Sequence, residues 1–206
     1  MVKKILLLAV LALALPLAAF ASSTIDFTNS GGTLTGSSSG VSLSSSTLIA
    51  VNGLFGGGLI QGTNLGSVSF TTGALVSGSL SGDATFAGGG SFTITGNGSN
   101  GIPNGVIFSG TFSGPVTLTG TQLANGTWSY TLSGPISGKL YTGFSTVAST
   151  VQLVFSTHKG PLANGGSATI SSGDSFVVVP EPGTLSLFGT GLIGLAGLVR
   201  RKLNLI

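Results

Sequence analysis

The sequence predicts an all-β fold, an antiparallel β-sandwich or barrel-like domain, with a transmembrane helix added near the C-terminus. Between residues 22 and 179, apolar residues alternate with Ser and Thr at a period of two. No window of this region keeps a helical period, and Asn-Gly pairs recur along it. The alternative fold is a β-solenoid, but the weak internal echoes are 32 and 20 residues apart, whereas a solenoid requires one constant interval.

The clearest alternation predicts six strands, each with an apolar face and a polar, uncharged face. These segments are residues 67–70, 91–95, 115–119, 127–132, 151–155 and 175–179. A hairpin is predicted over residues 116–132, turning at Asn125-Gly126, because Asn-Gly tolerates positive φ angles. Residues 22–66 are less regular, so we expect edge strands or a loose cover there. The expected core positions are Phe112, Val116, Leu118, Trp128 and Leu132.

The N-terminus has the features of a secretory signal peptide. Lys3-Lys4 precede an apolar run from residue 5 to 15, and Ala19 and Ala21 form a small-x-small cleavage site. We therefore expect residues 1–21 to be removed after passage through Sec-type export machinery.

Residues 22–179 are expected to form one Gly/Ser/Thr-rich all-β domain. This region has two lysines and three aspartates, so its net charge is −1 although the whole chain is formally +3. No basic patch is left to neutralise phosphates, which excludes nucleic acid as the expected partner. The chain has no cysteine, so packing and backbone pairing must supply its stability.

The C-terminus combines a polar motif, an apolar run and a basic end. Pro180, Glu181 and Pro182 precede an uncharged segment, residues 184–199, which as a helix would reach about 24 Å and predicts a short membrane span. The three basic residues that follow should stop transfer of the chain across the membrane and stay on its cytoplasmic side. They are Arg200, Arg201 and Lys202.

This three-part arrangement over residues 180–202 resembles the PEP-CTERM sorting signal of Gram-negative bacteria. The resemblance implies that an exosortase-like membrane enzyme recognises Pro180-Glu181-Pro182 and removes the tail. It also implies a precursor anchored in the inner membrane and a final place at the cell surface or in the extracellular matrix, in bacteria that make extracellular polysaccharide. It implies a destination for the protein and no activity of its own.

Two formal motifs lack the context that their chemistry needs. Residues 96–101 match G-x-G-x-x-G but lead into Ile102-Pro103, where no helix can open. Residues 36–40 match G-x-S-x-G inside a serine tract, where a triad would need Ser38 and the single His158.

The carboxylates are isolated in the sequence, so we expect no metal, no cofactor and no catalytic centre. Those of residues 22–179 are Asp26, Asp83 and Asp174.

The best candidates for ligand contact are aromatic. Trp128 and Tyr130 are two residues apart on one strand face, where they could stack on sugar rings or pack into the core. The expected function is a non-enzymatic cell-envelope or extracellular-matrix protein with a structural or adhesive role, associated with extracellular polysaccharide. The alternatives are a carbohydrate-binding module and a secreted hydrolase that uses Asp83, Asp174 or His158.

Overall fold

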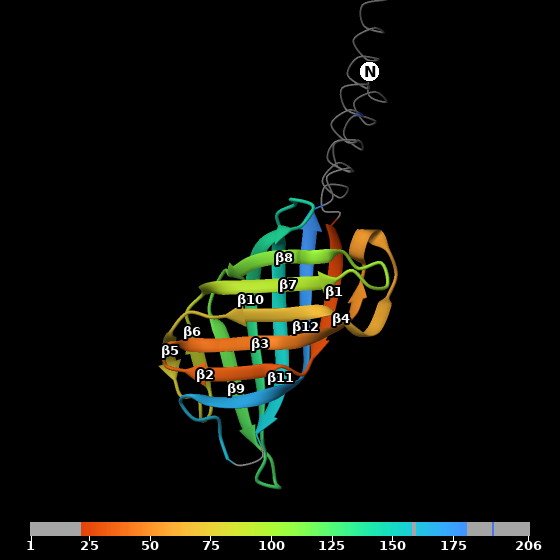
Figure 1. The fold of residues 1–206 in the computed structure, drawn as a ribbon. Coiled ribbons are helices and arrows are strands. Elements are labelled where there is room, and N and C mark those ends of the chain that lie inside the picture. The colour runs from red at the N-terminus through yellow and green to blue at the C-terminus, as the bar shows by residue number, and fades with distance from the viewer. Residues whose placement is uncertain (1–21, 158–159, 181–190, 192–206) are drawn as a thin grey trace, which may run out of the picture. The chain divides into compact units, whose positions relative to one another are not determined.

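Twelve β-strands and one short 3₁₀ turn make up the part of the chain that the computed structural model describes, residues 22–157, 160–180 and 191 (Figure 1). The predicted signal peptide and the predicted membrane helix, residues 184–199, lie outside the described residues, apart from residue 191. Among the described residues, no helix is long and apolar enough to cross a membrane. Residues Thr24–Val179 form one compact unit. The elements are β1 (Ser22–Ser30), β2 (Thr33–Ser37), β3 (Gly40–Asn52), η1 (Leu54–Gly56), β4 (Ile60–Thr71), β5 (Leu75–Gly78), β6 (Ala84–Phe86), β7 (Gly89–Asn97), β8 (Asn104–Phe112), β9 (Val116–Gln122), β10 (Trp128–Leu140), β11 (Val147–Thr157) and β12 (Gly166–Pro180).

The strand pairings run in a circuit around one core. From β12 they pass through β2, β3, β4, β7, β8, β10 and β11, and β11 pairs with β12 again. Strand β12 closes this circuit with two different partners. Its residues 166–169 pair with β2, and its residues 170–178 pair with β11. In Figure 1, strands β2, β3, β4, β7 and β8 cross in front of β9, β10 and β11. Strands that cross in this way are typical of orthogonally packed sheets.

The predicted all-β, antiparallel class is confirmed, since every pairing with a defined register is antiparallel. The alternative, a β-solenoid, is not observed in the described residues. Each of the six predicted segments overlaps a strand, and β9 and β10 form the predicted hairpin with Leu132 opposite Leu118. Its turn places Gly126 at φ 80°, where glycine avoids the strain that a Cβ would cause.

Because apolar and polar residues alternate along the strands, one face of each strand is apolar and packs into the core. Four of the five expected core positions are buried, and Trp128 is partly exposed while packing against the core. At the centre, the Phe92 ring lies 5.9 Å from the Phe70 ring and 6.0 Å from the Phe108 ring. Phe112 contacts both Phe70 and Phe92 edge to face. This cluster packs along the adjacent strands β4, β7 and β8, on the face that they turn to the core.

The expectation of edge strands or a loose cover for residues 22–66 is wrong. Strands β2, β3 and β4 are part of the main circuit, β1 pairs with both β3 and β12, and Phe27, Leu34 and Leu48 are fully buried. The β3–β4 pairing shifts register twice, and Ser45 adopts a positive φ in β3. Each such bulge breaks the period of two, which is why the sequence looked irregular there.

Candidate functional site

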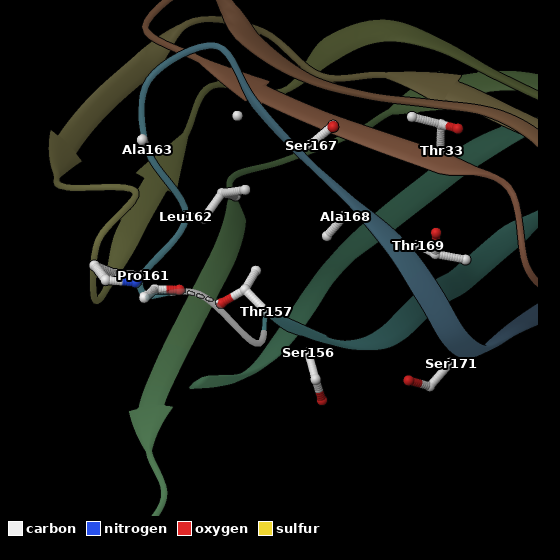
Figure 2. A pocket seen from close by; sticks show the side chains of 12 residues that line it. Thr33, Ser156, Thr157, Pro161, Leu162, Ala163, Ser167, Ala168, Thr169 and Ser171 are labelled. Atoms are coloured by element: carbon white, nitrogen blue, oxygen red, sulfur yellow. Dashed lines mark hydrogen bonds between the residues drawn. The ribbon is translucent and has the colours of Figure 1, made fainter. Parts of the chain in front are cut away.

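A groove of about 680 Å³ opens between the end of β11, the loop before β12 and the neighbouring strand β2 (Figure 2). We call it the hydroxyl groove, because six of its twelve lining residues are Ser or Thr. No described residue that lines it is charged. Its lining residues are Thr33, Ser156, Thr157, Gly160, Pro161, Leu162, Ala163, Gly166, Ser167, Ala168, Thr169 and Ser171.

The loop that forms one wall of the groove is fixed by backbone hydrogen bonds. The Gly165 amide donates to the Gly36 carbonyl at 2.7 Å, and the Gly166 amide donates to the Ala163 carbonyl at 2.8 Å. The Asn164 side-chain oxygen accepts from the Ser38 amide at 3.0 Å. These bonds hold the loop to the β2–β3 turn, so the groove has a preformed wall.

Both aromatic candidates lie next to this groove. Trp128 is the cross-strand partner of Thr157, which lines the groove, and its ring stacks on Tyr130 at 6.1 Å. The Tyr130 ring stacks in turn on Phe155 at 5.1 Å, and its hydroxyl accepts a 2.8 Å hydrogen bond from the Leu162 amide. Tyr130 is fully buried, so its ring offers no face to a sugar, whereas Trp128 is partly exposed. Tyr130 therefore supports the groove from beneath.

Replacing Tyr130 by Phe should loosen this wall. The substitution keeps the ring stack but leaves the buried Leu162 amide without its acceptor, which should cost about 1–3 kcal/mol of unfolding free energy. Hydrogen exchange at residues 160–165 should accelerate, as measured by mass spectrometry. Tyr141→Phe is the matched control, because Tyr141 is exposed. Equal protection of the loop in both variants would show that the hydroxyl does not hold it.

The hydroxyl groove can bind polar, uncharged groups. Each Ser or Thr hydroxyl can donate one hydrogen bond and accept others, although that of Thr157 already donates to the Gly160 carbonyl. Leu162 and Ala168 add apolar residues to the lining. Sugar hydroxyls and ring carbons present the complementary combination. The sequence did not single out these residues, because Ser and Thr alternate along nearly every strand.

The aspartates lie apart from the groove lining. Asp83 accepts a hydrogen bond from the Gly120 amide at 3.1 Å. Asp26 and Asp174 come from adjacent strands, β1 and β12, and one carboxylate oxygen of Asp26 is buried without a hydrogen-bond partner. Burial raises the pKa of Asp26 above its ordinary value of 3.8, and repulsion by Asp174 raises it further. Within the described residues, no three potential metal-ligating side chains gather closely enough to hold a metal ion.

Replacing Asp26 by Asn should stabilise the protein at neutral pH. The native state binds the Asp26 proton more tightly than the unfolded chain does, so wild-type stability should fall as the pH rises from 3.8 through the higher native pKa. The substitution should remove that fall, with a gain of at most about 1 kcal/mol because solvent screens a partly exposed pair. Urea unfolding at a series of pH values measures the effect. Asp83→Asn removes the same charge and should not stabilise, so equal gains in both variants would contradict this account.

Neither formal motif opens a helix. Residues 36–40 span the end of β2, the turn and the first residue of β3, and residues 96–101 span the end of β7 and the start of the β7–β8 connection. His158, the base that a Ser38 triad would need, lies outside the described residues. Ser38 itself uses its backbone for structure, since its carbonyl accepts a hydrogen bond from the Leu75 amide.

The sorting signal begins where β12 ends. Pro180 is the last residue of that strand. The other predicted signal residues are outside the described part of the chain; they are Glu181, Pro182, Arg200, Arg201 and Lys202, and, for signal-peptide cleavage, Ala19 and Ala21.

A sequence model of the PEP-CTERM protein-sorting motif matches residues 178–202. The chain carries the PEP-CTERM motif. This confirms the resemblance seen in the sequence and implies export, a membrane-anchored precursor in a Gram-negative bacterium and an exosortase-type processing enzyme as partner. No curated protein and no solved structure matches the chain.

Proposed function

We propose that this PEP-CTERM protein is a non-enzymatic structural or adhesive component of the cell surface or extracellular matrix, held there by extracellular polysaccharide. The PEP-CTERM motif supports sorting through an exosortase system. The hydroxyl groove supports the polysaccharide partner, because it offers several neutral hydrogen-bonding groups beside a partly exposed Trp128. Sugars are bound by such combinations of hydroxyl contacts and aromatic or apolar faces.

The described lining of the groove offers groups suited to binding. Hydrolysis needs a positioned nucleophile or a pair of groups that exchange protons, and the described lining has neither an acid nor a base. Asp26 and Asp174 are the nearest approach to a carboxylate pair, but neither lines the groove. A carbohydrate-binding module is therefore the second candidate, favoured by the position of Trp128 next to Thr157.

Loss of two groove hydroxyls should weaken polysaccharide binding. Thr33 and Thr169 are cross-strand partners in the groove, and replacing both by Val keeps their shape while removing two hydrogen-bonding groups. At about 1 kcal/mol for each lost hydrogen bond, binding should weaken by roughly tenfold to thirtyfold. Co-sedimentation of the purified protein with the polysaccharide of the producing strain measures this.

A matched control exists on the other side of the circuit. Thr119 and Thr131 are also cross-strand partners, on β9 and β10, and are absent from the groove lining. Replacing both by Val should leave binding unchanged. Equal binding by the two double variants, or no binding by the wild type, would refute the proposed polysaccharide site.

A further inference from the structure

Two loops of the domain expose apolar side chains that its core does not use. The first connects β3 to β4 and includes η1, where Phe55 is 64% exposed. The second connects β10 to β11 and contains Tyr141 and Phe144. We call this surface the aromatic end. Its exposed members are Phe55, Leu59, Val106, Tyr141, Phe144 and Val147.

Contacts link the β3–β4 loop, the β10–β11 loop and the start of β8. The rings of Phe55 and Tyr141 meet edge to face, with centroids 5.6 Å apart and an interplanar angle of 88°. The Tyr141 amide donates to the Ile107 carbonyl at 2.8 Å, next to Val106. Phe144 accepts a backbone hydrogen bond from Leu140 at 3.0 Å. The two loops and the start of β8 therefore present their apolar groups together.

The aromatic end lies where the domain begins and ends. Val147 pairs with Val178, close to the last residue of β12. Gly53, two residues before Phe55, packs its backbone against the carbonyl of Thr24 near the start of β1. Figure 1 shows the β10–β11 loop beside the end of β12, and the β3–β4 loop projecting at the right, next to β1.

The backbone at Phe55 is strained without gaining burial. Phe55 has φ 57° and ψ 25°, a left-handed conformation that is an outlier for a bulky side chain. Such strain tends to be kept at functional sites. Here it presents a phenyl ring to solvent, which the stability of the isolated domain does not explain.

We propose that the aromatic end rests on the lipid surface of the membrane in the anchored precursor, an inference that depends on the sorting function proposed above. Only four residues, 180–183, separate Val179 from the predicted membrane segment at Thr184, so the chain between these two residues spans at most about 18 Å. The end of the domain that carries Val178 is thus tethered close to the bilayer.

The chemistry of this end suits a lipid headgroup region. Aromatic residues are enriched at membrane–water interfaces, where the apolar ring contacts the acyl chains and a polar group such as the Tyr hydroxyl contacts water and headgroups. Lys139, the one Lys or Arg in the described part of the chain, is exposed and bridges to Ser145 at the base of the β10–β11 loop. Its charge can face anionic headgroups.

Site-specific fluorescence on the full chain tests this proposal. The sequence has no cysteine, so a single introduced cysteine takes one environment-sensitive label. The precursor is reconstituted in vesicles of phosphatidylethanolamine and phosphatidylglycerol, with and without brominated lipid. Phe55→Cys places the label at the aromatic end, and Leu123→Cys places it in the β9–β10 turn, where Leu123 is also exposed. Strand β10 runs from this turn to Leu140, next to Tyr141 of the aromatic end, so Leu123 and the aromatic end lie beyond opposite ends of that strand.

The label at position 55 should shift to shorter wavelength and lose about half of its emission to brominated lipid, because interfacial groups penetrate about 5–10 Å. The label at position 123 should do neither. Quenching of both labels, or of neither, would overturn the proposal. A blue shift at position 55 that appears in detergent and grows with protein concentration would also overturn it, because a second copy would then cover the surface.

Flotation of the same vesicles separates the two proposals. A precursor that does not float with lipid lacks its anchor, which contradicts the sorting function itself. A precursor that floats with an unquenched label at position 55 contradicts only the lipid contact. A further variant tests whether the aromatic end acts as one surface. In a protein labelled at Tyr141→Cys, the added substitutions Phe55→Ser and Phe144→Ser should halve the quenching by brominated lipid. Unchanged quenching would contradict a shared contact with lipid.

Discussion

Deletion of residues 184–202 should abolish membrane retention of the precursor. These residues comprise the uncharged segment and the basic end that follows it, and they fall within the matched PEP-CTERM motif at residues 178–202. Without them no apolar run is left after the domain to enter the bilayer, so the protein should move almost completely from the membrane fraction to the soluble fraction. Fractionation of cells followed by immunoblotting measures the change.

A single substitution in the same signal should separate anchoring from processing. Glu181→Gln keeps the apolar segment, so the precursor should still insert, but it removes the only charge of the Pro180-Glu181-Pro182 motif and should block tail removal. The intact mass should then include the whole tail. Asp83→Asn removes one carboxylate from the domain and should be processed normally. A wild-type protein that still ends at Ile206 in cells with an active exosortase would refute the assignment.

The fold class was predictable because alternation and turn chemistry are local. All six Asn-Gly pairs place their glycine at positive φ, as is typical of turns. Five of these glycines lie between strands, whereas Gly105, at φ 102°, lies within β8 and marks an irregular strand position. Which strands become neighbours was not predictable, because β12 pairs with β2 about 130 residues away and periodicity carries no such long-range information.

The candidate site was less predictable than the fold. The hydroxyl groove draws on β2, β11, β12 and the loop before β12, and its Ser and Thr residues look like those of any outward face. Trp128 and Tyr130 were recognised as a pair, but the sequence did not show that the distant loop of Leu162 contacts the Tyr130 hydroxyl. By contrast, the PEP-CTERM motif is a linear signal, so three short segments were enough to identify it.

Truncation of Phe92 to Ala should cause the largest loss of stability in the domain. Phe92 is fully buried on β7 and contacts the rings of Phe70, Phe108 and Phe112. Removing it deletes apolar burial and opens a cavity that rigid neighbouring strands cannot fill, with a cost of about 3–5 kcal/mol. A typical domain is stable by only about 5–15 kcal/mol, so the variant should lie close to its unfolding threshold.

Urea unfolding measures this cost, with circular dichroism reporting the strands and the single Trp128 reporting the core. Phe176→Ala is the matched control, because Phe176 is 40% exposed on the outer face of β12 and should cost about 1 kcal/mol or less. The difference between the two phenylalanines isolates burial from residue type. Similar small costs at both positions would mean that the aromatic cluster does not hold β4, β7 and β8 together, and that the chain depends on backbone pairing alone.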